Sequence, residues 1–527
     1  MKHSIGWLLV AWALPGWIPA AAADCEGLSQ LKLPATEITK AEAVAAGTFT
    51  PPSGGRLNEL PAFCRVAGVI RPSNDSHIRF EVWMPASGWN GKFQGVGNGG
   101  FAGSLSFAGL ADAIRNSYAA ATTDTGHQAS GQDASWAMGH PEKIVDFGHR
   151  AIHEMTVKGK AVVEAFYGSG PKRSYFSSCS NGGRQALMEA QRYPADYDGI
   201  IAGAPANYWT NLMLNAAAMT KATAGDAPAY IKPTKLPAIS EAALAACDST
   251  DGVKDGVIED PAKCQFDLNV LLCKGEETDK CLTAPQLKAL ARIYDGTRDS
   301  KGKLLVPGYA PGGEAEQGGW GPWITGPAPE RSAMHAFSSS FFRNMVYNDP
   351  AWDYRNLDVA RERKAAIEKM AAILDASNPD LRAFQARGGK LILYHGWSDA
   401  AIPGQHIIDY YESVVKKIGA KSAAGFLRLY MAPGVQHCAG GSGPNVFGQG
   451  GVAKGDASTN IASALERWVE QGAGPGQIIA TKYKSGSNPA SGVEKTRPLC
   501  PYPQVARYKG TGSTDEAANF DCAIVKR

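Results

Sequence analysis

Strand-like and helix-like stretches alternate along the first two hundred residues of the chain. Residues 78–84 alternate apolar with polar side chains, which is the period of a half-buried strand, and apolar residues recur at helical spacing over 146–167. The whole pattern predicts strands at 78–84, 92–97, 118–123, 174–178 and 198–203, and helices at 146–167 and 183–193. Such alternation is typical of an α/β fold with a mostly parallel sheet.

The alternation stops near residue 207. The segment that follows contains two close cysteine pairs, an acidic glycine loop and a stretch rich in Gly, Pro and Trp. The pattern then resumes with strands predicted at 390–394 and 426–431 and helices at 404–418 and 461–471. Because 527 residues exceed one hydrophobic core, we expect an inserted lid domain at 207–386. Residues 24–206 and 387–527 would form the catalytic domain, and the part before residue 78 is expected to be a loop-rich arm.

The first residues have the features of a secretory signal. Lys2 and His3 form a short polar start, an apolar stretch covers 5–18, and four alanines end at Ala23. A membrane anchor is the alternative, but the stretch is short and two prolines interrupt it. We therefore predict a signal peptide at 1–23 and a secreted or periplasmic mature protein.

The charge of the chain excludes some classes of partner. The formal net charge is +3, from 53 basic and 50 acidic residues, and no basic run stands out. Nothing in this balance indicates a nucleic acid or an anionic membrane surface as a partner.

All ten cysteines lie after the predicted signal peptide. An even number of cysteines in an exported protein indicates disulfides. Spacing favours four local pairs, Cys25–Cys64, Cys247–Cys264, Cys273–Cys281 and Cys500–Cys522, and leaves Cys179 and Cys438 for each other. This is the simplest pairing, and spacing alone leaves other connectivities open.

Two of these cysteines adjoin residues that carry hydrolytic chemistry. Cys179 precedes Ser180, and Cys438 follows His437. A disulfide between them would place the serine next to the histidine, which is the contact that serine hydrolysis needs. The thiolate of Cys179 is an alternative nucleophile, but an oxidising compartment and an available partner argue against a free thiol.

Ser180 lies between a predicted strand and a predicted helix. A tight turn of this kind needs small residues two positions either side of the nucleophile, and Ser178 and Gly182 meet that need. The backbone N–H groups of Asn181 and Gly100 are the expected oxyanion donors. The alternatives are a phosphate-binding turn at Ser180 and an ordinary tight turn at Gly100.

In this class of fold the acid and the histidine follow the serine in that order. Asp399 comes just after the strand predicted at 390–394, and His437 comes after the strand at 426–431. His406 falls on a predicted helix, where we expect a solvated or capping role. Asp399 as a helix cap and His437 as a surface residue are the alternatives.

The acidic loop has the composition of a calcium site. Asp248, Asp251 and Asp255 offer carboxylates, and the carbonyls of Val253 and Val257 offer further oxygens. The spacing is not that of an EF-hand, and a merely solvated acidic turn is the alternative. The flanking cysteines would stiffen the loop, which favours a structural Ca²⁺.

The motifs Cys179-Ser180, Asp399 and His437-Cys438 together resemble the tannase/feruloyl esterase family. The resemblance covers nearly all of the mature chain and implies an α/β-hydrolase fold with a calcium-binding lid. It implies hydrolysis of an ester whose aromatic acyl group lies between the core and the lid. The family also contains mono(2-hydroxyethyl) terephthalate hydrolase.

Aromatic residues of the lid are candidates for the wall of the substrate pocket. They are Trp320 and Phe337, with Trp323 and Phe341 as further candidates, and the alternative for each is the core of the lid. Gly99, beside the oxyanion glycine, stands where the resemblance to the terephthalate hydrolase implies a serine. That enzyme binds its carboxylate with a lid arginine, and neither Arg331 nor Arg343 matches it convincingly.

The expected protein is a secreted serine esterase that cleaves small hydroxycinnamoyl or galloyl esters through an acyl-enzyme. The alternatives are a terephthalate-monoester hydrolase of the same family and a non-catalytic, calcium-dependent binding protein on a hydrolase scaffold.

Overall fold

The computed structural model describes residues 24–524 and is built on one nine-stranded sheet. The order is β1-β4-β5-β7-β6-β8-β9-β12-β13, in which the first three pairs are antiparallel and the other five are parallel. The predicted α/β-hydrolase fold is confirmed, whereas the predicted signal peptide lies outside the described residues. The strands are β1 (Thr36–Val44), β4 (Phe63–Ile70), β5 (Ile78–Pro85), β6 (Lys92–Val96), β7 (Ala119–Thr123), β8 (Arg173–Cys179), β9 (Gly199–Gly203), β12 (Lys390–Gly396) and β13 (Leu427–Ala432).

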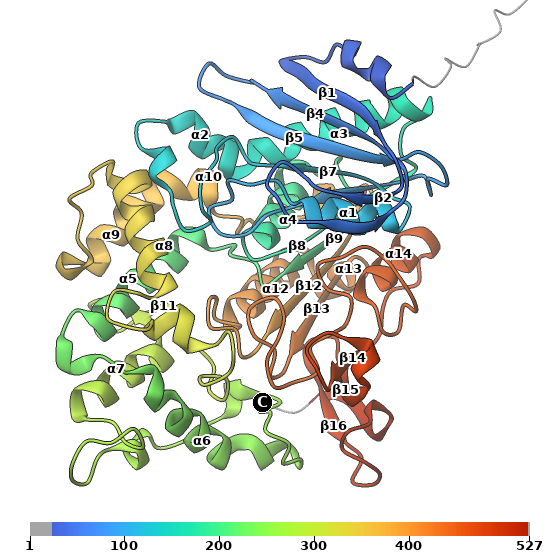
Figure 1. Ribbon diagram of the computed structural model, residues 1–527. Coiled ribbons are helices and arrows are strands. Elements are labelled where there is room, and N and C mark those ends of the chain that lie inside the picture. The colour runs from blue at the N-terminus through green and yellow to red at the C-terminus, as the bar shows by residue number, and fades with distance from the viewer. Residues whose placement is uncertain (1–23, 525–527) are drawn as a thin grey trace, which may run out of the picture.

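Helices cover both faces of the sheet (Figure 1). One face packs against α3 (Ala151–Tyr167), α4 (Asn181–Arg192) and α12 (Gln405–Ile418), which share a buried cluster with Leu391 and Leu393. The other face packs against α1 (Phe107–Arg115) and α14 (Ile461–Gln471), which share a second cluster with Ile392. Neighbouring residues of β12 thus point to opposite sides, as the pleat of a strand requires.

The N-terminal arm differs from the prediction, because it contains two strands of the main sheet. In β4 nearly every residue is buried, so the strand lacks the alternation that marks a half-buried strand. Arg65 interrupts its apolar run, and its guanidinium Nε lies 2.9 Å from Oε2 of buried Glu81 on β5. β1 is an edge strand with many exposed polar residues, so its sequence resembles a loop.

The segment between β9 and β12 is mainly helical and contributes no strand to the main sheet. Figure 1 shows it in green to yellow beside the sheet. Its helices are α5 (Trp209–Ala224), α6 (Leu236–Cys247), α7 (Ala284–Asp295), α8 (Ala333–Phe341), α9 (Val359–Ala366), α10 (Ala372–Leu374) and α11 (Arg382–Ala386), with the hairpin β10 (Thr297–Arg298) and β11 (Leu304–Val306). We refer to residues 207–386 as the insertion.

Smaller elements complete the chain. They are β2 (Gly47–Phe49), β3 (Leu57–Leu60), α2 (Pro141–Val145), α13 (Ala420–Ala424), β14 (Ile478–Tyr483), β15 (Val493–Leu499), β16 (Gln504–Tyr508) and β17 (Phe520–Ile524). Within residues 24–524, no helix is both long enough and apolar enough to span a membrane.

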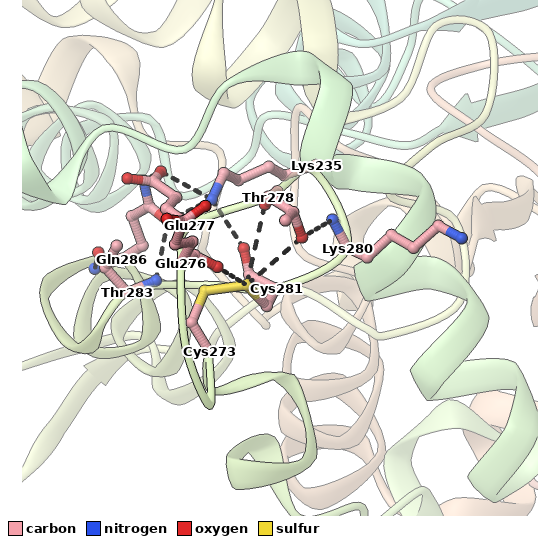
Figure 2. Close-up of a disulfide and its surroundings, with 9 residues drawn as sticks. All are labelled: Lys235, Cys273, Glu276, Glu277, Thr278, Lys280, Cys281, Thr283 and Gln286. Atoms are coloured by element: carbon pink, nitrogen blue, oxygen red, sulfur yellow. Dashed lines mark hydrogen bonds and ion pairs between the residues drawn. A yellow bond between two sulfur atoms is a disulfide. The ribbon is translucent and has the colours of Figure 1, made fainter.

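Five disulfides pair all ten cysteines. The pairs are Cys25–Cys64, Cys179–Cys438, Cys247–Cys264, Cys273–Cys281 and Cys500–Cys522, the same pairs that spacing favours. Figure 2 shows the one at Cys281, whose carbonyl accepts a 2.7 Å hydrogen bond from the buried ammonium of Lys235. Lys235 also lies 2.8 Å from the carboxylate of Glu277, so this loop of the insertion is held by a covalent bond and an ion pair.

A buried arginine joins α4 to its surroundings. The guanidinium of Arg184 is fully buried and donates to the carbonyls of Phe147, Gly148 and Leu374. Burial lowers the pKa of Arg184 to about 9. Since Leu374 belongs to the insertion, this one side chain connects the insertion to the helix that follows β8.

Replacement of Arg184 by methionine is expected to lower the free energy of unfolding by roughly 3 kcal/mol or more, because three buried carbonyls lose their donor. Urea unfolding measures the change. Arg467→Met, at an exposed position of α14, is the matched control and should have little effect. Equal unfolding midpoints for the two variants would show that these hydrogen bonds contribute nothing to stability.

Candidate active site

Ser180 occupies a strained turn between β8 and α4. Its φ angle is +67°, a conformation that residues other than glycine rarely adopt. A Cβ atom at Gly182 would lie 1.9 Å from Oγ of Ser178, so the turn requires glycine at that position. The Ser180 N–H donates to the carbonyl of Gly203 on β9, which fixes the turn to the end of the sheet. These features present the serine hydroxyl at the carboxyl ends of the parallel strands.

Three side chains that are distant in sequence meet at this edge. Nε2 of His437 lies 2.9 Å from Oγ of Ser180, and its Nδ1 lies 2.8 Å from Oδ2 of Asp399. Asp399 follows β12, and His437 lies in the loop after β13. The arrangement places a hydroxyl, an imidazole and a carboxylate in one hydrogen-bonded line.

Asp399 is buried and has several donors. Its Oδ1 accepts from the N–H groups of Ala401 at 2.8 Å and Ile402 at 2.9 Å. Burial opposes the charge of Asp399, but the imidazoles of His437 and His395 hold the pKa of this carboxyl well below its usual range. Asp399 is therefore an anion that orients the ring of His437.

His395 is a member of the site that the sequence reasoning missed. Its Nε2 lies 3.0 Å from the carbonyl oxygen of Ile402 and 3.2 Å from Oδ2 of Asp399. Because both neighbours are acceptors, Nε2 carries the proton. The sequence feature that could have indicated this role is the position of His395 at the end of β12, four residues before Asp399.

The disulfide Cys179–Cys438 lies directly beside the reacting groups. It joins two positions that are 259 residues apart, with their Cα atoms separated by 5.9 Å. Since Cys179 adjoins Ser180 and Cys438 adjoins His437, the bond limits how far the serine and the imidazole can separate.

The insertion braces the loop that carries His437. The side chain of Gln436 is buried, and its Nε2 donates to the carbonyl of Gly313 and to Oε2 of Glu316, both at 2.9 Å. The indole ring of Trp323 lies 5.1 Å from the imidazole ring of His437. No local pattern in the sequence indicates these contacts, because they join segments more than one hundred residues apart.

The two predicted oxyanion residues lie at the same pocket as Ser180. Gly100 has a φ angle of +57°, and a Cβ atom there would lie 2.2 Å from the carbonyl oxygen of Gly131. Asn181 is the first residue of α4, so its N–H has no partner within the helix. Gly99 is exposed beside Gly100, with open space where a side chain would project.

An apolar pocket adjoins these groups. Beyond the catalytic groups its wall consists of residues from α5, from α8, from the helical turn at 321–325 and from two loops: Ala206, Trp209, Leu212, Met213, Ala216, Trp323, Met334, Phe337, Ala401 and Ile402. Phe337 was predicted at this wall and lies there. Trp320 and Phe341 are instead buried in the core of the insertion, where the Trp320 ring lies 5.3 Å from that of Tyr294.

His406 is not part of the line of three residues. It lies on α12 as predicted, but it is buried rather than solvated, with its ring 5.5 Å from that of Tyr208. The expected solvated role is therefore wrong, because the first turn of α12 packs against the start of α5.

The acidic loop offers only oxygen ligands. Asp248 is buried and accepts from the N–H groups of Asp255 and Gly256 at its Oδ1, each at 3.2 Å. Asp255 pairs with the guanidinium of Arg497. Burial, with the charge of Asp255, raises the pKa of Asp251. An extra cation would offset this unfavourable charge, so the residues fit a hard cation such as Ca²⁺. Val253 and Val257 lie in the same loop and are both buried.

Within residues 24–524, one group of three side chains brings possible metal-binding atoms within 4.8 Å of one another: His153, Glu189 and Asp196. Nδ1 of His153 lies 2.7 Å from Oδ2 of Asp196. Burial, together with the charge of Asp196, raises the pKa of Glu189 well above its usual value. The raised pKa favours the neutral form of Glu189 beside Asp196.

Comparisons with known proteins agree with the fold and with the site. Residues 64–523 match the family described as tannase and feruloyl esterase. The chain is 46% identical to an uncharacterized esterase of Xanthomonas campestris, over 95% of this chain and 92% of that protein. It is 34% identical to a probable feruloyl esterase B of Aspergillus clavatus, over 94% of each.

Among solved structures, the chain is similar to feruloyl esterase B from Aspergillus oryzae, with a TM-score of 0.88 and 30% identity. The match covers 95% of this chain and 99% of that one. The fold, the line of three residues and these relatives lead to one conclusion: the chain is a carboxylic ester hydrolase that belongs to the tannase and feruloyl esterase family.

Proposed function

We propose that this protein is an exported serine esterase that cleaves esters of small aromatic acids, of the hydroxycinnamoyl or galloyl type. The observation that carries the proposal is the hydrogen-bonded line from Ser180 through His437 to Asp399, which opens on a pocket with an aromatic wall. The names of the relatives support the aromatic substrate, and the five disulfides support export.

The reaction follows from the geometry in two stages. Oγ of Ser180 attacks the ester carbonyl while Nε2 of His437 takes its proton, and Asp399 stabilises the imidazolium. The N–H groups of Asn181 and Gly100 stabilise the oxyanion. His437 then gives the proton to the departing alcohol. Water, activated by the same imidazole, next hydrolyses the acyl-enzyme and restores Ser180.

We also propose that the acidic loop holds a structural Ca²⁺. The ligands would be the carboxylates of Asp248, Asp251 and Asp255 and the carbonyls of Val253 and Val257. A bound cation supplies charge compensation there and takes no part in ester cleavage.

Ser180→Ala is expected to lower kcat for methyl ferulate by roughly 10⁴-fold or more, because no nucleophile remains. Steady-state kinetics measures the loss, and circular dichroism checks that the fold is intact. Ser485→Ala, at an exposed serine, is the matched control. Turnover by the Ser180 variant at the parental rate would remove Ser180 from the mechanism.

The double variant Cys179→Ser/Cys438→Ser is expected to lose about 100-fold in kcat, because small displacements of reacting groups are costly. The control is Cys273→Ser/Cys281→Ser, which opens the disulfide shown in Figure 2. The control should keep its kcat. Equal kcat values for the two double variants would contradict a role for the Cys179–Cys438 bond in aligning the site.

Removal of Ca²⁺ with EGTA is expected to lower Tm by several degrees, since a ligand at about 100 times its Kd stabilises by about 2.7 kcal/mol. Activity at low temperature should change less than Tm does. In Asp251→Asn the Tm should no longer respond to EGTA. An unchanged melting curve, with no metal found by elemental analysis, would refute the calcium site.

A further inference from the structure

We propose that the apolar pocket beside Ser180 accepts uncharged acyl groups with few hydroxyls, and that it rejects acyl groups with a free carboxylate or several ring hydroxyls. This inference rests on the proposed function, because it assumes that the acyl part of the ester occupies this pocket. It narrows the proposed function, because a galloyl ring carries three hydroxyls and would be rejected, whereas hydroxycinnamoyl groups with few free hydroxyls would be accepted.

No residue of the pocket wall carries a positive charge. Leu212 and Met213 of α5 and Met334 of α8 supply apolar side chains, and all three are at least nine-tenths buried. His437 is the one titratable side chain of the lining, and its two ring nitrogens are already engaged with Ser180 and Asp399.

Three arginines on α4 and around α8 do not serve the pocket. Arg184 lies against the Trp209 ring, but its N–H groups donate to backbone carbonyls and to Oδ1 of Asn181. Arg343 lies on the other side of α8, and its Nε donates to the carbonyl of Trp352. Arg331 precedes α8, is exposed and does not line the pocket. A carboxylate in the pocket would therefore be buried without a cationic partner, which is strongly unfavourable.

Helix α8 separates two different surfaces. Met334 and Phe337 face the pocket beside Ser180, whereas His335, Ala336 and Arg343, at the C-terminal continuation of the helix, line a separate polar groove. The helix carries both apolar and polar residues, and its apolar side faces Ser180. The pocket is therefore apolar.

Ring hydroxyls find few side-chain acceptors in the pocket. Apart from Ser180 and Asn181, no wall residue has a side-chain oxygen. The carbonyls of Ala401 and Ile402 already accept from Tyr309 and His395. The indole N–H of Trp209 is itself buried without an acceptor, so this wall residue adds no acceptor to the pocket. A phenolic O–H brings a proton that remains unpaired in this pocket, whereas an ether oxygen brings no proton and needs no acceptor.

The test compares matched esters on the parental enzyme. Monomethyl terephthalate and dimethyl terephthalate differ by a free carboxylate, and kcat/KM is expected to be roughly 100-fold lower for the monoester. Methyl caffeate should be about tenfold poorer than methyl 3,4-dimethoxycinnamate, because its two hydroxyls are unpaired. Ratios within one enzyme preparation do not depend on the fraction that is folded.

A pair of variants tests the wall directly. Met334→Arg places a cation at the pocket and should reduce the 100-fold preference for the diester to tenfold or less. Ala336→Arg makes the same substitution on the other side of α8, at the separate groove, and should leave the ratio unchanged.

The outcomes separate this inference from the proposed function. p-Nitrophenyl acetate has a small acyl group and reports on Ser180 independently of the pocket wall. If the protein cleaved neither p-nitrophenyl acetate nor any of the aromatic esters, the proposed function would be refuted. Cleavage of p-nitrophenyl acetate with equal kcat/KM for the mono- and diester of terephthalate would overturn the specificity alone. An unchanged ratio in Met334→Arg would also count against it.

Discussion

The hydrogen bond between buried Asp399 and His437 is the interaction on which the rest of this site depends. A carboxylate at this depth is unfavourable unless donors surround it, and the chain supplies backbone N–H groups and a second imidazole, His395. With the anion fixed in this way, the orientation of His437 is fixed too. Ser180 then needs only to be held on the other side of the ring.

The loop that carries His437 is held from two directions. On the core side, the Cys179–Cys438 bond ties it to the turn at Ser180. On the opposite side, Gln436 is bonded to the insertion at Gly313 and Glu316. The insertion therefore does more than cover the sheet, because its backbone contributes to the position of the imidazole.

Much of this arrangement could be predicted from the sequence, because its markers are local. Ser180 lies between a strand pattern and a helix pattern, each catalytic residue follows a strand, and two of them adjoin cysteines. The strands β1 and β4 were missed since edge exposure and a buried Arg65–Glu81 pair remove the expected alternation.

The residues of the pocket wall could not be predicted from local sequence patterns. Trp320 and Trp323 look equivalent in the sequence, yet the short helical turn at 321–325 directs one into the core and the other to His437. Nearly every residue of α5 up to Thr220 is buried, and no local signal separates those that line the pocket from those that face the core. Contacts between distant segments decide this.

The insertion braces His437 and shapes the pocket with two different segments, and this separation affects how such an enzyme can change during evolution. Gly313 and Glu316, which brace the base, lie on a different segment of the insertion from Met334 and Phe337, which shape the pocket. Substitutions on α8 can therefore alter which acid is recognised while the hydrogen bonds that align His437 persist. Related enzymes with this architecture can therefore differ in the esters that they cleave through substitutions on one helix, while the catalytic reaction stays the same.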